Sequence, residues 1–353
     1  MKNRSSNKNN KNINIMDNLY KTKPDGINRF LLLFYAALFA FSFFLNPVIA
    51  FAGPDGSGNN FFYKGPMAFA YLRSGKFLTE QALDYQSFNS KFNDSGSVEH
   101  LSYNVVKYVY APQFIGTFKF LGLDNYIEAI VPFGKALMST KCNHSRGGLD
   151  DPELYYGIYA YHYSGNGSGN GFIINILPQL SITFPYGNWN NSSLVNIGGD
   201  EWQFQPALTG VLGIKASAEQ RIILNYAVGY SINKGHPTVN ESAINDEGYS
   251  YTDPGNDFFT DAFLNYIFLN KFDVYDEVSY TKQYDNYGYF INNYGDTAFG
   301  YINGGYQDFI EGLGLTYHYD KSLSFDARAL KDMYGENAPD GDYGEFDVVY
   351  DFK

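Results

Sequence analysis

The clearest pattern in the chain lies between residues 172 and 214, where apolar and polar residues alternate one by one. From Phe172 to Phe184 the even positions are apolar, and the odd positions include Asn175 and Gln179. A period of two is typical of a β-strand with one apolar face. Strands of soluble proteins usually end after about six residues, whereas a strand that crosses a bilayer needs about 9–11. The length of this run therefore favours a membrane-spanning strand.

The same alternation recurs along most of the chain and predicts a series of further strands. The predicted strands are 103–110, 114–120, 126–133, 154–163, 172–184, 202–214, 221–233, 258–268, 272–284, 309–319, 323–333 and 344–352. A candidate first strand lies at Pro66–Tyr71, followed by an irregular stretch at Leu72–Gly96. Pro112 is expected to break one run, and Lys135–Asp151 is expected to be a long polar loop.

The segments between the strands alternate in length. Short turns are expected at Ser217–Gln220, Asn270-Lys271 and Asp320-Lys321, and long loops at Gly187–Glu201, Gly235–Asp257, Asp285–Gly304 and Gly335–Tyr343. Short turns at one end and long loops at the other are typical of outer-membrane barrels, in which the short turns are periplasmic. The predicted fold is therefore all-β, a transmembrane antiparallel up-and-down β-barrel of about 12 strands within a range of 10–14.

Residues 1–52 have the pattern of a secretory signal peptide. A polar, basic stretch precedes the apolar run Phe30–Leu45, and small residues end the segment at Ala52. This order predicts cleavage after Ala52. The alternative is an uncleaved anchor, but the apolar run is short for a spanning helix and a proline follows it. Translation starts at either Met1 or Met16.

The remaining chain is predicted to divide into two parts. Residues 53–99 form an N-terminal lead-in that contains either a first strand or a periplasmic or lumenal segment. Residues 100–353 form the barrel. An exported chain with long alternating strands indicates the outer membrane of a Gram-negative bacterium, where lipid and lipopolysaccharide are the expected partners.

Composition supports this prediction and excludes one class of partner. Aromatic residues make up 19% of the chain and charged residues 18%, with 33 Tyr, 31 Phe and 36 Gly. Tyr and Phe favour strands and interfacial belts, and Gly favours turns. The net charge is −12, and residues 1–52 hold seven basic and two acidic side chains, which leaves −17 on the rest. A chain this acidic lacks the basic face that nucleic acid requires.

Polar side chains interrupt the predicted strands on the face opposite to the large apolar residues. A charge that faces lipid in the middle of a bilayer costs about 2–4 kcal/mol, so these side chains are expected to line the lumen. The lumen-lining candidates are Glu128, Asn175, Gln179, Arg221, Asn225, Asp261, Asn265 and Asp347, with Asp351 next in the same phase. Asp276, Glu311 and Lys331 fall in the apolar phase, which indicates either a position near the membrane interface or a slip in the predicted register.

Few residues suggest catalysis, a metal or a cofactor, and none of the three is predicted. Cys142 is the only cysteine, so no intrachain disulfide is expected, and with His144 it makes only a weak metal signal. The acidic stretch Asp340–Asp342 lacks the 12-residue ligand loop of a calcium site. The histidines His100, His162, His236 and His318 are scattered, and no nucleophile motif accompanies them.

The order of the loop motifs resembles a known family, the outer-membrane proteins grouped as meta-pathway (MetA-pathway) phenol-degradation proteins. The stretches that carry the resemblance are Gly148–Pro152, Phe184–Trp189, Asn196–Trp202, Tyr251–Asp257, Gln283–Asp285 and Gly335–Gly341. The matched positions are Asp151, Pro152, Pro185, Gly187, Asn196, Gly198, Trp202, Gly255, Asn337 and Gly341. Departures include Tyr186 in place of Thr and Ala338 in place of Arg. The resemblance covers about residues 66–352.

The resemblance implies an outer-membrane barrel that helps small, often aromatic or hydrophobic, compounds to cross. The leading hypothesis is accordingly a passive channel for small solutes, in which loops such as Gly187–Glu201 fold inward and an acidic lumen disfavours anions. The alternative is a surface structural or adhesive barrel whose loops bind a partner. Trp189, Trp202 and the tyrosines fit the interfacial belt of a monomer or a trimer alike.

Overall fold

The structure is a computed structural model that describes most of the chain from Leu72 onward. The described residues are 72–139, 143–165, 171–188, 197, 201–217, 219–235, 251–253, 255–284, 286–291, 297–302 and 305–352. Two compact units divide the chain, Met1–Val48 and Ile49–Lys353, and every described residue belongs to the second. The predicted signal peptide therefore lies outside the described residues.

All regular elements of the described residues are strands. They are β1 (Phe77–Phe92), β2 (Val98–Phe120), β3 (Leu123–Ile130), β4 (Phe133–Ser139), β5 (His144–Leu149), β6 (Glu153–Ile158), β7 (Tyr161–Ser164), β8 (Gly171–Thr183), β9 (Glu201–Lys215), β10 (Gln220–Gly235), β11 (Tyr251–Asp253), β12 (Asp257–Phe268), β13 (Phe272–Gln283), β14 (Asn286–Ile291), β15 (Thr297–Ile302), β16 (Tyr306–His318), β17 (Leu323–Glu336) and β18 (Pro339–Phe352). No helix in this part of the chain has the length and apolar character needed to cross a membrane.

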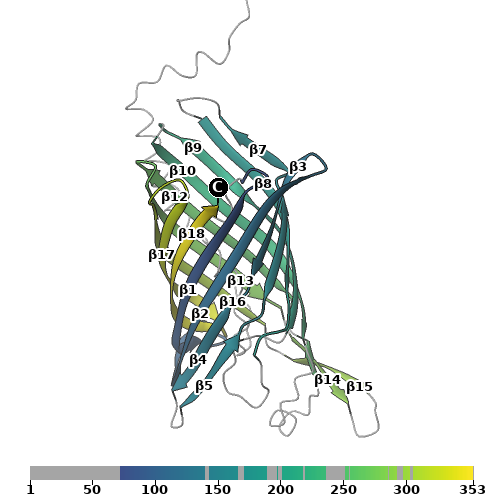
Figure 1. Cartoon of the computed structure of the whole chain (residues 1–353). Coiled ribbons are helices and arrows are strands. Elements are labelled where there is room, and N and C mark those ends of the chain that lie inside the picture. Colours follow the sequence, from purple (N-terminus) through teal and green to yellow (C-terminus); the bar gives the residue numbers. More distant parts are fainter. Residues whose placement is uncertain are drawn as a thin grey trace, which may run out of the picture. The chain divides into compact units, whose positions relative to one another are not determined.

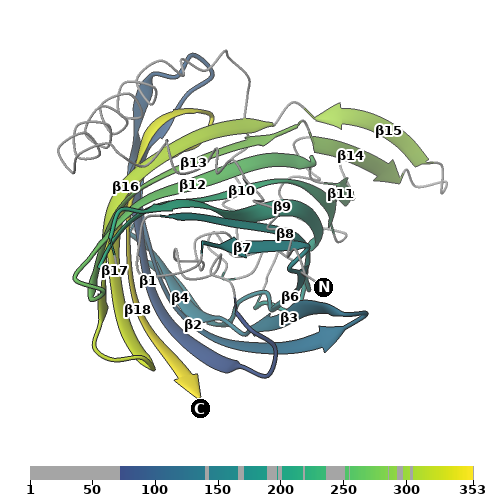
Figure 2. The ribbon, with the colours of Figure 1, turned by 90° about the horizontal axis from the view of Figure 1, so that it is seen from above.

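Twelve of these strands close into one antiparallel barrel. The order around the wall is β1, β18, β17, β16, β13, β12, β10, β9, β8, β6, β3 and β2, and β2 pairs again with β1. Figure 1 shows the first and last strands side by side, and Figure 2 shows the wall from above. The pairing of β1 with both β18 and β2 closes the wall, as a bilayer requires of a spanning sheet, while the short strands β5 and β7 each pair on one side. The predicted fold class and the predicted number of strands are both confirmed.

The wall between β2 and β8 is built from shorter pieces. Residues 113–120 of β2 pair with β3, whereas residues 104–110 pair with β4, which continues into the hairpin partner β5. β6 and β7 likewise pair with different parts of β8. The segment Lys135–Asp151 was expected to be a polar loop, and this expectation was wrong, because its residues form most of β4 and all of β5.

Three prolines lie inside long strands, and each sits at a gap in the ladder of backbone pairs. Pro112 falls between the parts of β2 that pair with β4 and with β3. Pro178 falls between the parts of β8 that pair with β7 and with β6. Pro206 falls in the break between Phe204 and Ala207 of β9. A proline has no N–H to donate, so these gaps are the positions that tolerate it. The prediction that Pro112 ends a strand was therefore wrong.

The two ends of the barrel differ in their connections. One end, the turn end, carries the short connections β2–β3, β9–β10, β12–β13 and β16–β17. The other end, the loop end, carries the long connections that follow β8, β10 and β13. Gly335–Tyr343 was expected to be a long loop, but β17 and β18 continue through it and leave only Asn337 and Ala338 between them. Asn337 turns the chain there with a positive φ of 50°.

The first described strand of the barrel lies in a stretch that was expected to be irregular. β1 at Phe77–Phe92 occupies most of the stretch that was expected to be irregular, and it pairs along nearly its whole length with both β18 and β2. The barrel therefore begins within residues 53–99 and not at residue 100. The candidate strand at Pro66–Tyr71 lies outside the described residues.

The outer face of the wall is apolar. Large side chains with more than a third of their surface exposed point outward from most barrel strands, among them Phe77, Leu83, Phe114, Ile127, Phe172, Leu180, Leu212, Val228, Phe258, Val274, Leu313, Leu315, Phe346 and Phe352. The charged residues that fell in the apolar phase do face outward, and no register slip is needed to explain them. Glu311 and Lys331 lie opposite each other on β16 and β17. Lys331 also lies 3.2 Å from Asp342 on β18, close to the loop end.

Candidate functional site

The inner face of the barrel holds nearly all of the buried polar side chains. The wall is a single layer, so a side chain can only be covered from the inside. Along β12 the buried residues Asp257, Phe259, Asp261, Phe263 and Asn265 alternate with outward residues, and the other long strands follow the same rule. The candidate functional site is therefore this inner face.

Large aromatic rings fit inside the barrel because glycines lie beneath them. Tyr275 lies opposite Gly314 in the β13–β16 ladder, and a Cβ atom on that glycine would come within 2.0 Å of the tyrosine ring. Tyr126 and Gly157 make the same arrangement between β3 and β6, also at 2.0 Å. The rings therefore lie flat against the wall and leave the polar groups around them facing inward.

One side of the inner face, which we call the acidic wall, consists of β1, β12, β13, β16, β17 and β18. Its buried carboxylates are Glu80, Asp84, Asp257, Asp261, Asp273, Glu277, Asp308, Asp326, Asp332, Glu336, Glu345 and Asp347. Arg328 on β17 is the only buried Lys or Arg among the described residues. The buried carboxyl groups of this wall therefore far outnumber its buried basic groups.

Arg328 joins three strands of the acidic wall. Its Nη1 donates to both carboxylate oxygens of Glu277 on β13, at 3.0 and 2.8 Å, and its Nη2 donates to Glu345 on β18 at 2.7 Å. The guanidinium also lies 6.0 Å from the centre of the Phe263 ring. The three charged side chains have exposed fractions of 0%, 5% and 3%, so water screens these pairs little.

The opposite side, which we call the amide wall, consists of β8, β9 and β10. Its buried polar side chains are Asn175, Gln179, Ser181, Thr183, Gln203, Gln205, Thr209, Asn225, Ser231 and Asn233, and none of them carries a charge. These groups bond to one another: the Ser181 hydroxyl donates to Gln205 at 2.9 Å, and Ser231 donates to Asn233 at 2.5 Å. Amides and hydroxyls can both donate and accept, so the side chains of this wall can bond to one another without a counter-ion.

A short relay connects the two walls. Asn225 on β10 donates to Asn265 on β12 at 2.8 Å, and Asn265 donates to Asp273 on β13 at 3.1 Å. On the other side of the amide wall, Tyr126 of β3 donates to Gln179 of β8 at 2.7 Å. Hydrogen bonds therefore join the amide wall to the acidic wall on one side and to β3 on the other.

The structure places the predicted lumen residues on both walls and between them. Seven of the eight are buried: Glu128, Asn175, Gln179, Asn225, Asp261, Asn265 and Asp347. Arg221 is only partly buried and lies near the turn end, where its guanidinium donates to Asn270 at 3.1 Å. Asp351 lies near the same end and pairs with Lys76 at 2.5 Å.

Sequence reasoning missed the residues at the centre of the acidic wall. Arg328, Glu277 and Glu345 were not singled out, although each sits in the polar phase of a predicted strand. Alternation alone could have found Arg328, which follows Asp326 by two positions. Glu80 and Asp84 were missed because their strand was not predicted.

One residue of the long β8–β9 connection, Ile197, packs against the inside of the wall. Ile197 is 3% exposed and packs on Ala136 and Met138, which lie on the inner face of β4. Lys107 of β2 donates to the Ile197 carbonyl at 3.2 Å and pairs with Asp150 at 2.8 Å. This contact is consistent with the expected inward fold of Gly187–Glu201, although most of that loop lies outside the described residues.

Several family-motif positions meet near this loop or at turns. The Gly187 N–H donates to Asp151 at 2.6 Å, next to Pro152 and close to Pro185. Gly341 donates to Asp332 at 2.7 Å, and the Gly255 carbonyl accepts from Asn233 at 2.8 Å. Trp202 packs against Phe184 with ring centres 5.3 Å apart. Asn196 and Gly198 lie outside the described residues. The located motif positions thus shape turns and strand ends.

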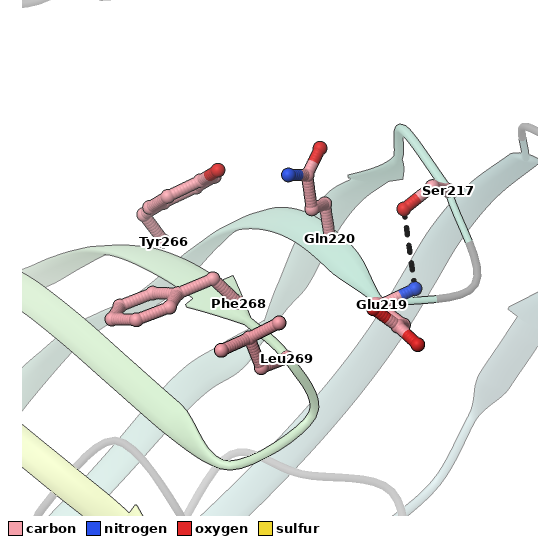
Figure 3. Close-up of a pocket in the computed structure, with 6 residues that line it drawn as sticks. All are labelled: Ser217, Glu219, Gln220, Tyr266, Phe268 and Leu269. Atoms are coloured by element: carbon pink, nitrogen blue, oxygen red, sulfur yellow. Dashed lines mark hydrogen bonds between the residues drawn. The ribbon is translucent and has the colours of Figure 1, made fainter.

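A surface pocket at the turn end is not part of this site. Figure 3 shows its lining, which is Ser217, Glu219, Gln220, Tyr266, Phe268 and Leu269. Two hydrogen bonds between these residues close the β9–β10 turn. The Glu219 N–H donates to the Ser217 hydroxyl, and the Ser217 N–H donates to the Gln220 carbonyl, both at 3.2 Å. The pocket is the open space between two neighbouring turns.

The described residues contain no cluster of His, Cys, Asp and Glu arranged to hold a metal ion. The histidines that the structure places make local contacts. His162 bonds to Asn175 at 2.6 Å, and His318 bonds to Ser324 across the β16–β17 hairpin at 2.8 Å. His236 and Cys142 lie outside the described residues. The predicted lack of a catalytic role stays a prediction.

The model of one protein family matches residues 89–347, and its description is "Putative MetA-pathway of phenol degradation". The chain belongs to this family. The match covers most of the barrel, and it confirms the resemblance that the loop motifs suggested. No curated protein matches the sequence.

Solved structures support the fold of this family member. The COG4313 outer membrane channel from Pseudomonas putida F1 is similar with a TM-score of 0.65 and 12% identity, over 82% of this chain and 100% of that chain. At this identity the likeness concerns the fold alone. That fold, together with the apolar outer face, agrees with the predicted location in the outer membrane.

Two other barrels show weaker likeness. The KdgM porin in complex with disordered oligogalacturonate has a TM-score of 0.36 and 12% identity, over 78% of this chain and 99% of that chain. The TodX monoaromatic hydrocarbon channel mutant has a TM-score of 0.38 and 10% identity, over 85% of this chain and 96% of that chain. These two barrels add nothing to the assignment of fold or function.

Proposed function

We propose that the barrel is a passive outer-membrane channel for small solutes. The observation that carries the proposal is the division of the wall into an apolar outer face and a polar, charged inner face. A barrel that served only as a scaffold could fill its interior with apolar side chains, whereas a path for solutes needs groups that replace water around them. The family assignment and the fold that this chain shares with an outer membrane channel support the proposal.

The charge of the inner face indicates which solutes pass. The acidic wall repels anions, so neutral and cationic solutes are favoured. The family description makes small aromatic compounds the first neutral solutes to test. We propose that the short turns face the periplasm and that lipid and lipopolysaccharide surround the outer face, with Lys331 near the headgroups.

Conductance in a planar bilayer tests the proposal. Correctly folded protein is first identified by heat-modifiable migration on a gel, which is typical of closed barrels. We expect discrete current steps and a reversal potential that shows preference for cations over anions. Folded protein that gives no current, and no swelling of liposomes in small aromatic or sugar solutes, would contradict the channel. The adhesive alternative depends on long loops that lie mostly outside the described residues.

We further propose that residues 1–52 are a cleaved signal peptide. The test is the N-terminal sequence of the protein from outer-membrane fractions. Cleavage after Ala52 gives Gly53 as the first residue. A mature chain that retains the apolar run Phe30–Leu45 would show an uncleaved anchor instead.

A further inference from the structure

Four carboxylates meet where the first and last strands close the barrel. Glu80 and Asp84 lie on the inner face of β1, and Glu345 and Asp347 lie on the inner face of β18, with exposed fractions of 3%, 7%, 7% and 1%. Asp84 stands directly opposite Glu345 in the β1–β18 ladder. Ala82 lies opposite Asp347, between Glu80 and Asp84 on the inner face of β1, and carries no polar group that could bond to the carboxylates. We call these four carboxylates the seam cluster.

The seam cluster has little positive charge of its own. One oxygen of Glu345 accepts from Arg328, but Arg328 shares its charge with Glu277. No N–H or O–H donor reaches either oxygen of Asp347, Oδ2 of Asp84 or Oε1 of Glu345, and the Glu345 carboxylate lies within hydrogen-bonding distance of both Asp84 and Asp347. Asp347 is also close enough to Glu345 and Glu80 for strong repulsion between the carboxylates. Carboxylates held together away from water need either a counter-charge or a bound proton.

The surroundings indicate the kind of cation that provides this counter-charge. The described residues offer no arrangement of acidic ligands suited to a metal ion. The same region already holds one organic cation, because the Arg328 guanidinium lies between two carboxylates and 6.0 Å from the Phe263 ring. Planar or compact nitrogen cations with several N–H donors match carboxylate edges in this way.

We propose that the seam cluster binds small organic cations that carry a guanidinium or primary ammonium group, held by Asp347 and by the unpartnered oxygens of Asp84 and Glu345. The inference deepens the proposed function. Binding of the cation does not depend on the channel, but a role of this binding in transport rests on the proposed channel function. Amines and guanidines that carry a positive charge would then be favoured solutes of the channel, and the seam cluster would be their binding site in the lumen.

The experiment measures the thermal midpoint of the folded, heat-modifiable band of the full chain in detergent. Methylguanidinium chloride is added at millimolar concentration, with N-methylurea as a neutral probe of similar shape and KCl at the same ionic strength. Methylguanidinium is expected to raise the midpoint by about 3 °C at roughly ten times its dissociation constant. The two control solutes are expected to leave it unchanged.

Variants locate the effect. The double variant Asp84→Asn, Asp347→Asn keeps the side-chain shapes, relieves the repulsion and is expected to fold but to lose the methylguanidinium shift. The matched control is Asp342→Asn, which makes the same charge change on the outer face of β18, where its side chain is 72% exposed. This control is expected to keep the full shift.

Three outcomes would overturn the proposal. The first is no shift in the wild-type protein, which would mean that protons neutralise the seam. The second is an equal shift with KCl, and the third is a shift that survives in the double variant. Conductance recorded on the same preparations separates this proposal from the channel. Current without a methylguanidinium shift would reject the seam site alone, and a shift without current would reject the channel alone.

Discussion

The acidic wall and the amide wall solve the same problem in different ways. Both must place polar side chains inside a barrel whose outer face is apolar. The amide wall pairs most of its donors with neutral acceptors, as Ser181 does with Gln205, while Asn233 also donates to Asp257 of the acidic wall. The acidic wall presents acceptors in excess and ties some of them to a single guanidinium at Arg328. The amide wall therefore leaves few buried polar groups unsatisfied, whereas the acidic wall depends on protons, cations or solutes.

The largest test of this contrast is to remove the central cation. Arg328→Met leaves Glu277 and Glu345 buried without their partner, and breaking a buried ion pair in this way costs about 3–5 kcal/mol. The matched change on the amide wall is Gln205→Met, which is expected to cost only about 1–3 kcal/mol because one neutral network loses a member. Thermal midpoints of the heat-modifiable band provide the measurement. Equal losses in the two variants would remove the distinction between the walls.

Exchanging an acid for an amide tests the same contrast with a smaller effect. Asp261 lies close enough to Glu277 for repulsion, and one of its carboxylate oxygens is buried without a hydrogen-bond partner. Asp261→Asn should therefore raise the free energy of unfolding by about 1 kcal/mol. Asn225→Asp removes the donor that bonds to Asn265 and adds a buried charge, so stability should fall by about 2 kcal/mol. Urea titration of both variants gives the signs. Two changes of the same sign would contradict the assignment of charged and neutral sides.

Lys107 lies on β2, next to β1 at the border of the acidic wall, and allows a further test. Lys107→Met removes the bond to the Ile197 carbonyl and the pair with Asp150, which weakens the attachment of the β8–β9 connection by about 1 kcal/mol. The mean single-channel conductance is expected to increase as this connection leaves the inner face of β4. Lys76→Met is the control, because Lys76 pairs with Asp351 at the turn end. A conductance that rises equally in both variants would argue against a specific role of the loop.

The smallest effect is expected on the outer face of the same strand. Lys331 lies three positions after Arg328 but is 54% exposed, and its partner Asp342 is 72% exposed. Lys331→Met should change stability by less than about 0.5 kcal/mol, because exposed ion pairs contribute little. The same thermal assay used for Arg328→Met makes the comparison direct. A loss as large as that of Arg328→Met would mean that the outer pair is screened from solvent by lipid.

The sequence predicted those strands in which one face is consistently apolar. β8, β10, β12, β13 and β16 follow this rule, so their alternation carried the prediction. The sequence did not predict β1 because its outward positions include the polar residues Thr79 and Gln81, which interrupt the apolar face. Their polar groups bond to Gln113 and Tyr110 on the neighbouring β2. β4 and β5 were not predicted because they are short and because Gly, Lys, Ser and Arg interrupt their alternation. In each case a contact with another strand satisfies groups that look like loop residues.

The individual inward residues were predictable, but their grouping was not. Alternation places Asp261 and Asp347 inside the barrel as soon as their strands are recognised. The seam cluster, however, depends on the pairing of β1 with β18, and the Arg328 contacts depend on β13, β17 and β18 being neighbours. Such pairings join distant parts of the chain, and no local spacing encodes them.

The closure between β1 and β18 also has a consequence for how the protein is made. Residues that meet there are far apart in the gene, as the pair Lys76 and Asp351 shows with a separation of 275 positions. Without β18, one side of β1 and one side of β17 have backbone N–H and C=O groups that no strand pairs. A bilayer does not tolerate such edges. A chain truncated near its C-terminus is therefore expected to be degraded in the periplasm before it inserts.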